Sequence, residues 1–206
     1  WDESASVNAD IILLGNNTEH IEAHGNVSST HHKTTGKSEA HFHQLFNSNS
    51  PVFATAESLL KKNDSMHYQG KARLWQKNNR IEAHSITVDQ ASKKLTAQGG
   101  VKTTIRTQRS TSGEKTAAQH VQDPVRVYAD SLDYNEITGK AIYRNRVKLT
   151  QKKLIVLSNE MEGFLEKQAS GEVELQVAFA RGSVTISKIA GSGQEDRKGF
   201  GTAAEY

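Results

Sequence analysis

The chain has 206 residues and no cysteine, so disulfides, thiolate nucleophiles and thiolate metal sites are excluded. It is 35% hydrophobic and 24% charged with a mean hydropathy of −0.65, a polar composition that fits strands with one side in water. The net charge is +3, because 26 basic residues nearly balance 23 acidic ones. No long run of Lys or Arg is present, which disfavours nucleic acid as a partner.

Apolar and polar residues alternate along most of the chain, as in strands with one buried face. Turn signals rich in Asn, Gly, Lys and Ser interrupt the alternation at intervals of roughly eight to twelve residues. Short strands joined by turns predict an all-β, antiparallel meander, sandwich or roll, and they exclude a parallel α/β architecture. The clearest predicted strands are residues 68–75, 101–105, 125–129, 143–150, 172–179 and 183–186.

Three segments rich in Ser, Thr, Gly, Gln and charge interrupt the strands. These segments, residues 30–50, 107–123 and 191–198, are expected to be long loops or hairpin tips. No apolar stretch approaches the roughly 20 residues of a membrane helix.

An internal repeat runs through the sequence. Ala-Glu-Ser-Leu at residues 56–59 returns as Ala-Asp-Ser-Leu at residues 129–132. Two further pairs of segments match at about the same interval of 74 residues, namely 68–74 with 143–149 and 21–27 with 95–101. A fixed interval of this size predicts stacked copies of one supersecondary unit.

The repeat predicts one continuous domain over residues 1–206. It divides into a partial repeat at 1–50, repeats at 51–126 and 127–201, and the start of a further repeat at 202–206. We therefore expect the chain to begin and end inside a longer array. Residues 161–168 have some helical propensity, but we expect a strand there because the equivalent segment of the preceding repeat looks extended.

The fullest copy of the repeat is residues 128–151, with an acidic start, a Thr-Gly-Lys turn and the return strand Val-Lys-Leu-Thr-Gln. In this order and spacing it resembles the repeat of the OstA-like, or LptA-like, lipopolysaccharide-transport proteins. The copy at residues 56–76 keeps the frame, with Leu60 in place of the second Tyr and without the Thr-Gly-Lys turn. Gly70 matches a Gly usual in that family, and Asn145 departs from it.

The resemblance implies an antiparallel β-jellyroll, slightly open and V-shaped in section, whose apolar interior carries the acyl chains of lipopolysaccharide. It implies a non-enzymatic transport role without a cofactor, in the periplasm or in association with the outer membrane. The implied partners are lipopolysaccharide and other jellyrolls of the same kind, stacked edge to edge through unpaired edge strands.

Apolar residues of inward parity are the candidate lining of a lipid groove. Each acyl CH₂ removed from water contributes about 0.8 kcal/mol, so such a groove needs no polar contact. The same residues could instead fill a closed core, and both interpretations stay open. The candidates are Leu74, Ile81, Ile86, Val88, Val101, Tyr143, Val147, Leu149, Ile155, Leu157, Met161, Leu175, Val177, Phe179, Val184 and Ile186.

Cations follow the polar side of the strand at residues 143–150. Arg144, Arg146 and Lys148 could contact lipid phosphates or the acids of a partner, or they could form a solvated outer face. Trp75 interrupts the polar side of the equivalent strand and is a candidate contact residue.

Other functions find less support in the sequence. The nine histidines include His31 beside His32 and the pair His41 and His43, but their spacing matches no zinc pattern, so no metal site is predicted. There is no Gly-x-Ser-x-Gly elbow, so no catalytic site is predicted. A structural scaffold without a lipid ligand is the main alternative, whereas an aromatic content of 6% disfavours a carbohydrate-binding solenoid.

Overall fold

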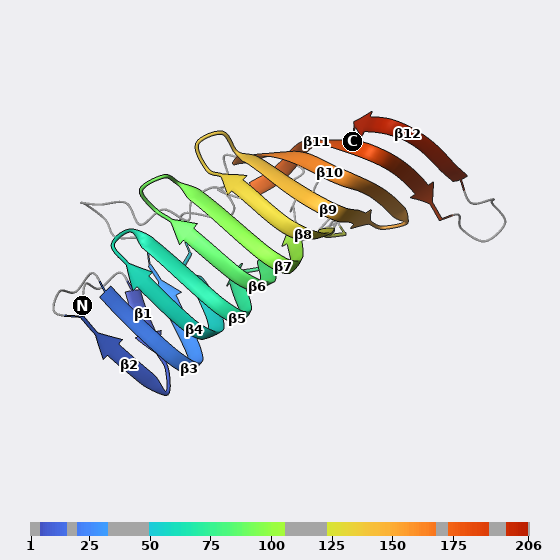
Figure 1. The fold of residues 1–206 in the computed structure, drawn as a ribbon. Helices are drawn as coiled ribbons and strands as arrows, with labels where there is room; N and C mark the ends of the chain where they lie inside the picture. Colours follow the sequence, from blue (N-terminus) through green and yellow to red (C-terminus); the bar gives the residue numbers. More distant parts are fainter. Residues whose placement is uncertain are drawn as a thin grey trace, which may run out of the picture.

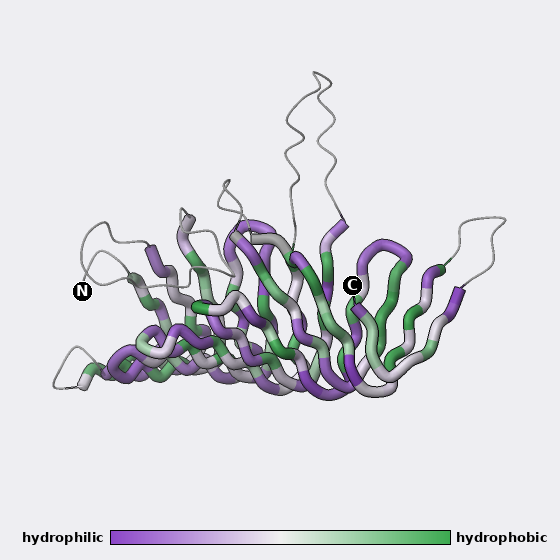
Figure 2. The backbone as a smooth tube through the Cα atoms, turned by 90° about the horizontal axis from the view of Figure 1, so that it is seen from above, coloured by the Kyte–Doolittle hydropathy of each residue, from purple (hydrophilic) through white to green (hydrophobic). Residues whose placement is uncertain are grey.

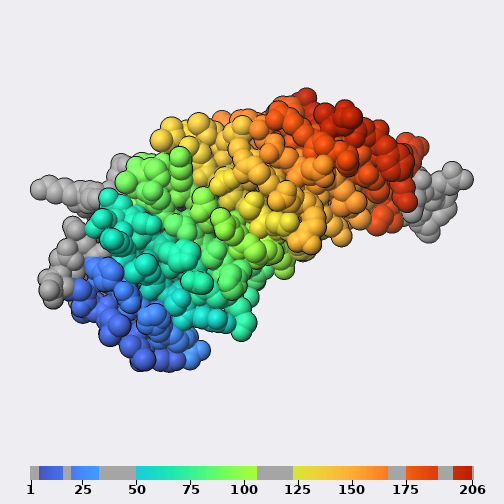
Figure 3. All heavy atoms as spheres, viewed as in Figure 1, coloured from blue at the N-terminus to red at the C-terminus, as the bar shows by residue number. Residues whose placement is uncertain are grey.

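The computed structural model describes residues 5–15, 20–32, 50–105, 123–167, 173–189 and 197–205, and this part of the chain consists of strands and their connections (Figure 1). The strands follow one another along an elongated body, from β1 and β2 at one end to β12 at the other (Figures 1 and 3). None of the described residues forms a helix that is long and apolar enough to cross a membrane. The predicted all-β, antiparallel architecture is confirmed.

The strands are β1 (Ala5–Asn8), β2 (Ile11–Leu14), β3 (His20–His31), β4 (Val52–Lys62), β5 (Ser65–Gln76), β6 (Asn79–Asp89), β7 (Lys94–Ile105), β8 (Val125–Asn135), β9 (Lys140–Gln151), β10 (Leu154–Lys167), β11 (Val173–Lys188) and β12 (Arg197–Glu205). From β3 onward each strand pairs with the next one in sequence. β1 and β2 both pair with β3, so together they act as one interrupted edge strand. β12 forms the other edge, and the sheet is open as predicted.

Tight turns join several of these strands. Asn63, Lys77 and Lys152 have φ values of 51°, 50° and 52°, the left-handed conformation that two-residue hairpin turns require. The longer turn after β6 is held by the carboxylate of Asp89, which accepts a hydrogen bond from the backbone N–H of Ser92 at 2.9 Å. This bond lowers the pKa of Asp89.

A line of bulges crosses the sheet near the middle of the strands. Pairing between neighbours shifts there, for example between Thr55 and Ser58 of β4 and between Gln98 and Val101 of β7. Bulges of this kind bend a strand and increase its twist. Figure 2 shows the result: the strands curve, and the sheet turns back toward itself as two facing walls.

The bulge in every second strand contains two consecutive residues of positive φ. These pairs are Gly25-Asn26, Gly70-Lys71, Gly99-Gly100, Asn145-Arg146 and Gly182-Ser183. Asn tolerates this backbone region better than most residues, which explains how Asn145 takes the place that Gly holds in the other copies. We call this line of bulges the corner.

The corner divides the sheet into two walls. Wall A comprises residues 11–14, 20–24, 57–69, 84–98, 130–144, 160–167, 173–181 and 203–205. Wall B comprises residues 5–8, 27–31, 52–56, 72–83, 101–105, 125–129, 147–158, 184–188 and 197–201. The buried apolar residues of both walls form one core between them.

Polar pairs at the corner account for the acid that opens each repeat. An acid on the neighbouring strand, or in the connection between β1 and β2, faces the second residue of the positive-φ pair across the bulge. The pairs are Asp10 with Asn26 at 3.0 Å, Glu57 with Lys71 at 3.0 Å and Asp130 with Arg146 at 3.0 Å.

Several boundaries differ from expectation. Residues 161–167 form part of β10, so the predicted strand is confirmed there. His31 ends β3, and Arg197 and Lys198 begin β12, where the sequence predicts loop. Most of the three predicted loops lies outside the described residues. The division into repeats stays a prediction, and its boundary at residue 127 falls inside β8.

Candidate functional site

The interior between the walls is filled unevenly along the molecule. Because neighbouring strands are paired in register, inward residues form rows across the sheet. One row of wall A carries large side chains over β5–β7 and small ones over β9–β11, and all its members are buried. In order, the row is Met66, Val88, Leu95, Tyr134, Ala141, Gly163 and Ala178.

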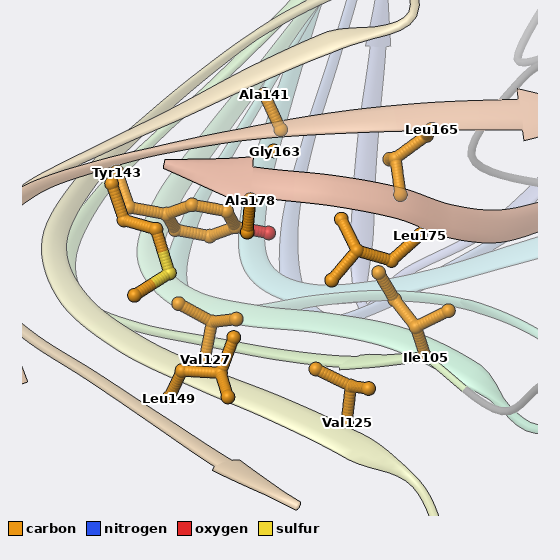
Figure 4. A pocket seen from close by; sticks show the side chains of 11 residues that line it. Ile105, Val125, Val127, Ala141, Tyr143, Leu149, Gly163, Leu165, Leu175 and Ala178 are labelled. Atoms are coloured by element: carbon orange, nitrogen blue, oxygen red, sulfur yellow. The ribbon is translucent and has the colours of Figure 1, made fainter. Parts of the chain in front are cut away.

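Two small cavities lie where this row becomes small. The first, of about 10 Å³, has Ala141, Gly163 and Ala178 on wall A and residues such as Val125 and Val127 on wall B (Figure 4). The second, of about 60 Å³, extends toward the β12 edge and is lined there by Ala204 and Glu205. Leu149, Met161 and Ala178 line both cavities.

A polar network bridges the walls in the other half of the interior. The hydroxyl of Tyr68 on wall A lies 2.9 Å from the Ser29 hydroxyl and 2.9 Å from Nε2 of His31, both on wall B. Ser29 and His31 are themselves 3.0 Å apart. Burial lowers the pKa of His31 to about 4 and raises that of Tyr68. The network therefore joins the walls through neutral groups at neutral pH.

The equivalent positions of the next repeat are less polar. Tyr143 and Thr103 correspond to Tyr68 and Ser29, whereas Ile105 takes the place of His31 and lines the first cavity. Burial raises the pKa of Tyr143 to about 12. An apolar residue thus stands where the first repeat carries the imidazole, on the side of the molecule that contains the cavities.

Three buried hydroxyls lack a hydrogen-bond partner among the described residues. They belong to Thr103, Tyr134 and Ser158. Tyr134 lies in the wall A row at the step from large to small residues, and burial raises its pKa. Leaving such a group unpaired costs about 1–3 kcal/mol, and none of the three hydroxyls belongs to the network of Tyr68, Ser29 and His31.

Most of the predicted groove residues face the interior. Ten of them are buried in the core, namely Leu74, Ile81, Ile86, Val88, Val101, Tyr143, Val147, Leu149, Met161 and Val184. Leu175 and Ile186 are partly buried, pack against that core and each line a cavity. Their contact with a lipid stays a prediction.

The other four candidates lie on the outward side of the sheet. Ile155 and Leu157 flank the buried Val156 in β10, and Leu157 is 42% exposed. Val177 and Phe179 flank the buried Ala178 in β11. The prediction that these four residues point inward is therefore wrong.

Bulges explain the difference. In β10 the pairing shifts between Ser158 and Glu160, and in β11 Gln176 is the extra residue between Leu175 and Val177. One inserted residue exchanges the two faces of everything beyond it. Counting alternate residues through a bulge therefore assigns one end of the strand to the opposite face.

The row of cations at residues 144–148 is split by the corner. Arg144 lies on wall A, where it contacts the carboxylates of Asp133 and Glu160. Arg146 pairs with Asp130 at the corner. Lys148 is exposed on the outward side of wall B. The three side chains therefore belong to different surfaces, and phosphate contact by any of them stays a prediction.

Sequence reasoning missed the small residues that shape the cavities. Ala141, Gly163 and Ala178 carry no chemistry of their own, and the available signal was their contrast with Met66 and Val88 in the preceding copy. His41 and His43 lie outside the described residues. Among the residues that are described, no group of three His, Asp or Glu side chains could hold a metal ion.

Comparison with known protein families found a match. A family model described as the LptA/(LptD N-terminal domain) LPS transport protein matches residues 5–94. The predicted resemblance is confirmed for this segment. The match to the LptA and LptD N-terminal family covers β1 to β6 and ends at the first residue of β7, before the cavities.

A comparison with solved structures found a similarity to LptH, the LptA homologous periplasmic component of the lipopolysaccharide transport device from Pseudomonas aeruginosa. The two chains share 13% sequence identity, with a TM-score of 0.44, over 73% of this chain and 94% of LptH. A search of curated proteins found no significant match.

Proposed function

We propose that this chain is a non-enzymatic lipid-transport module that carries lipopolysaccharide across the periplasm, with acyl chains held between walls A and B. The match of residues 5–94 to a lipopolysaccharide-transport family supports the transport role. The observation that carries the acyl-chain site is the apolar interior over β9–β11, where Ala141, Gly163 and Ala178 leave space unfilled.

Loading a lipid requires the walls to separate. The larger cavity has a volume of about 60 Å³, whereas pockets for drug-sized ligands have roughly 300–1,000 Å³. The sheet is open, so its walls can move about the corner without breaking the strand ladder. Each acyl CH₂ that enters contributes about 0.8 kcal/mol, which offsets the cost of parting the apolar side chains.

The half of the interior around Tyr68 is a poorer lipid site. A chain that entered there would break the contacts of Tyr68 with Ser29 and His31 and leave buried polar groups unpaired, at a cost of about 1–3 kcal/mol for each group. We therefore place the acyl chains over β9–β11, next to the β12 edge.

Edge strands offer a route to neighbouring modules. β12 pairs only with β11, and the interrupted edge strand of β1 and β2 pairs only with β3 among the described strands. Their free N–H and C=O groups can pair with the edge of another roll. Stacked in this way, modules would extend the interior into a longer path for lipid.

Photo-crosslinking from single positions tests the lipid site. A photoreactive residue at Met161, which lines both cavities, should crosslink to lipopolysaccharide in a Gram-negative host. At Phe179, on the outward side of the neighbouring strand, the same residue should give no such product. Ile86, paired with Tyr68 in the filled half, should give little or none.

The scaffold alternative predicts a different result. If lipopolysaccharide crosslinks from neither Met161 nor the partly buried Leu175, while an established carrier gives a product in the same cells, the chain is a structural repeat without this ligand. Circular dichroism of each variant establishes that it is folded. The use of two cavity positions keeps the test valid if one substitution unfolds the protein.

A further inference from the structure

The outward side of wall B carries cations in two adjacent rows that run from β4 to β12. One row passes through Arg73, Lys102 and Lys148, and the other through Arg80, Arg126 and Lys198. All residues of these two rows from β4 to β12 are described in the structure, and Glu82 is the one carboxylate among them. We call this surface the basic face.

Pairing within the basic face leaves half of its cations uncompensated. Glu82 lies 3.0 Å from Arg73, 3.5 Å from Arg80 and 3.3 Å from Lys102. For Arg126, Lys148 and Lys198, the structure shows no ion pair with another described residue, and all three are exposed. The positive charge is therefore strongest over β8–β12.

Large apolar side chains share the same two rows. Phe200 is 80% exposed, Leu157 42% and Tyr128 37%. At the other end of the basic face, Phe53 and Trp75 stack with their ring centres 5.6 Å apart. The apolar members of the two rows are Phe53, Trp75, Tyr128, Ile155, Leu157 and Phe200.

The opposite side of the molecule has the opposite charge. A row along the outward side of wall A contains Glu22, Asp133, Glu162 and Glu205 and no Lys or Arg. In a neighbouring row Lys140 lies 3.0 Å from Glu162, and this contact lowers the pKa of that carboxyl. The net charge of +3 therefore conceals a separation of charge between the two walls.

We propose that the basic face binds the surface of an anionic lipid bilayer, with its cations at the headgroup phosphates and its apolar side chains in the interfacial layer. Basic residues interspersed with aromatic and aliphatic ones are the composition of surfaces that lie on membranes. A nucleic acid backbone would engage the cations but would leave Leu157, Ile155 and Phe200 in water. The bilayer satisfies both sets of side chains.

This site is distinct from the interior proposed for acyl chains. The interior is lined by the inward residues of both walls, whereas the basic face consists of outward residues of wall B. A lipid in the interior and a membrane on the basic face can therefore be present together. Membrane contact would align the long axis of the roll with the bilayer. Vesicles without lipopolysaccharide test the basic face separately from the transport role.

Co-sedimentation with vesicles measures the interaction. The protein should bind vesicles of phosphatidylcholine and phosphatidylglycerol (about 3:1) far better than pure phosphatidylcholine, and high salt should weaken the binding. At about 1 kcal/mol for each Lys, the double variant Lys148→Glu with Lys198→Glu should lower the partition coefficient about thirtyfold or more. Phe200→Ser should lower it with little change in salt dependence.

A matched variant reverses two lysines on wall A. Lys62→Glu with Lys94→Glu changes the net charge equally, at exposed positions on the acidic side of the roll. This variant should retain most of the binding. Equal losses in the two double variants, or equal binding of the wild type to neutral and anionic vesicles, would overturn the proposal. Binding to polyglutamate but not to vesicles would instead identify an acidic protein as the partner.

Discussion

Among the described histidines, His31 is the one that lies buried in the core between the two walls. It is buried between the walls within 3.0 Å of two hydroxyls, and burial lowers its pKa from 6.5 to about 4. In the unfolded chain it takes up a proton near pH 6.5, while the folded protein does so only near pH 4. Stability is therefore lost as the pH falls through this window and changes no further from this group below it.

The replacement His31→Ile tests this assignment, because Ile105 occupies the equivalent position of the next repeat. The lowered pKa of His31 should reduce the free energy of unfolding by about 3 kcal/mol between pH 7.5 and pH 4. Without it, the fall in Tm over that range should be smaller than in the wild type by roughly 6–12 °C. Thermal denaturation at both pH values measures the difference, and His84→Asn controls for the loss of a surface imidazole.

An unchanged pH dependence in His31→Ile would show that other groups control acid stability. The hydroxyls of Ser29 and Tyr68 remain 2.9 Å apart and can still bond each other without the imidazole. The variant therefore isolates titration from the loss of the bridge between the walls.

Strands in this protein are shaped by their bulges as much as by their alternation. Gly99 and Gly100 of β7 both have positive φ, 81° and 65°, but their surroundings differ. A Cβ at Gly99 would lie 2.6 Å from Cβ of His84, whereas a Cβ at Gly100 would meet nothing within 4 Å. In β7 the corner thus requires Gly at the first position, where β9 instead has Asn145, and it tolerates other residues at the second position, as Lys71 and Arg146 demonstrate.

Two alanine variants distinguish backbone strain from a steric clash at the corner. Gly100→Ala should lower the free energy of unfolding by about 1 kcal/mol through the backbone alone. Gly99→Ala should cost at least about 2 kcal/mol more than Gly100→Ala, because a core strand must shift to admit the methyl group. Urea denaturation gives both values. Equal losses would mean that β6 moves away freely, and His84→Gly should partly rescue Gly99→Ala.

The same bulges limit what the sequence can predict. Alternation and the repeat are sufficient for the all-β class, the strands and the buried face of most segments, since these depend on local pattern. The faces of Ile155, Leu157, Val177 and Phe179 depend on single inserted residues, and nothing in a polar run such as Ser158-Asn159-Glu160 marks which one is extra. The cavities depend on rows that join distant strands, so they become visible only once the register is known.

Across the whole molecule, the open sheet combines three separate features. The interior is filled around Tyr68 and contains small cavities around Met161, the outward sides carry opposite charge, and each edge has only one partner among the described strands. The first two follow from rows of residues in register, and the third follows from the open ends of the sheet. A module built in this way has separate surfaces for a ligand inside, a membrane outside and neighbours at its ends.

Hydrogen exchange along the chain tests whether lipid binds in the part of the interior that contains the cavities and not around Tyr68. Amides of β5 and β6 should exchange slowest, because these strands have two neighbours and lie over the filled part of the interior, and amides of β1, β2 and β12 should exchange fastest. Added lipopolysaccharide should slow exchange mainly in β9–β11, where the cavities lie, and leave β5 and β6 nearly unchanged. Mass spectrometry of peptic fragments resolves these segments. Protection that spreads evenly from β3 to β12, or that centres on Tyr68, would contradict an acyl-chain site confined to the part that contains the cavities, because a lipid that fills the whole interior must first break the bridge to Ser29 and His31.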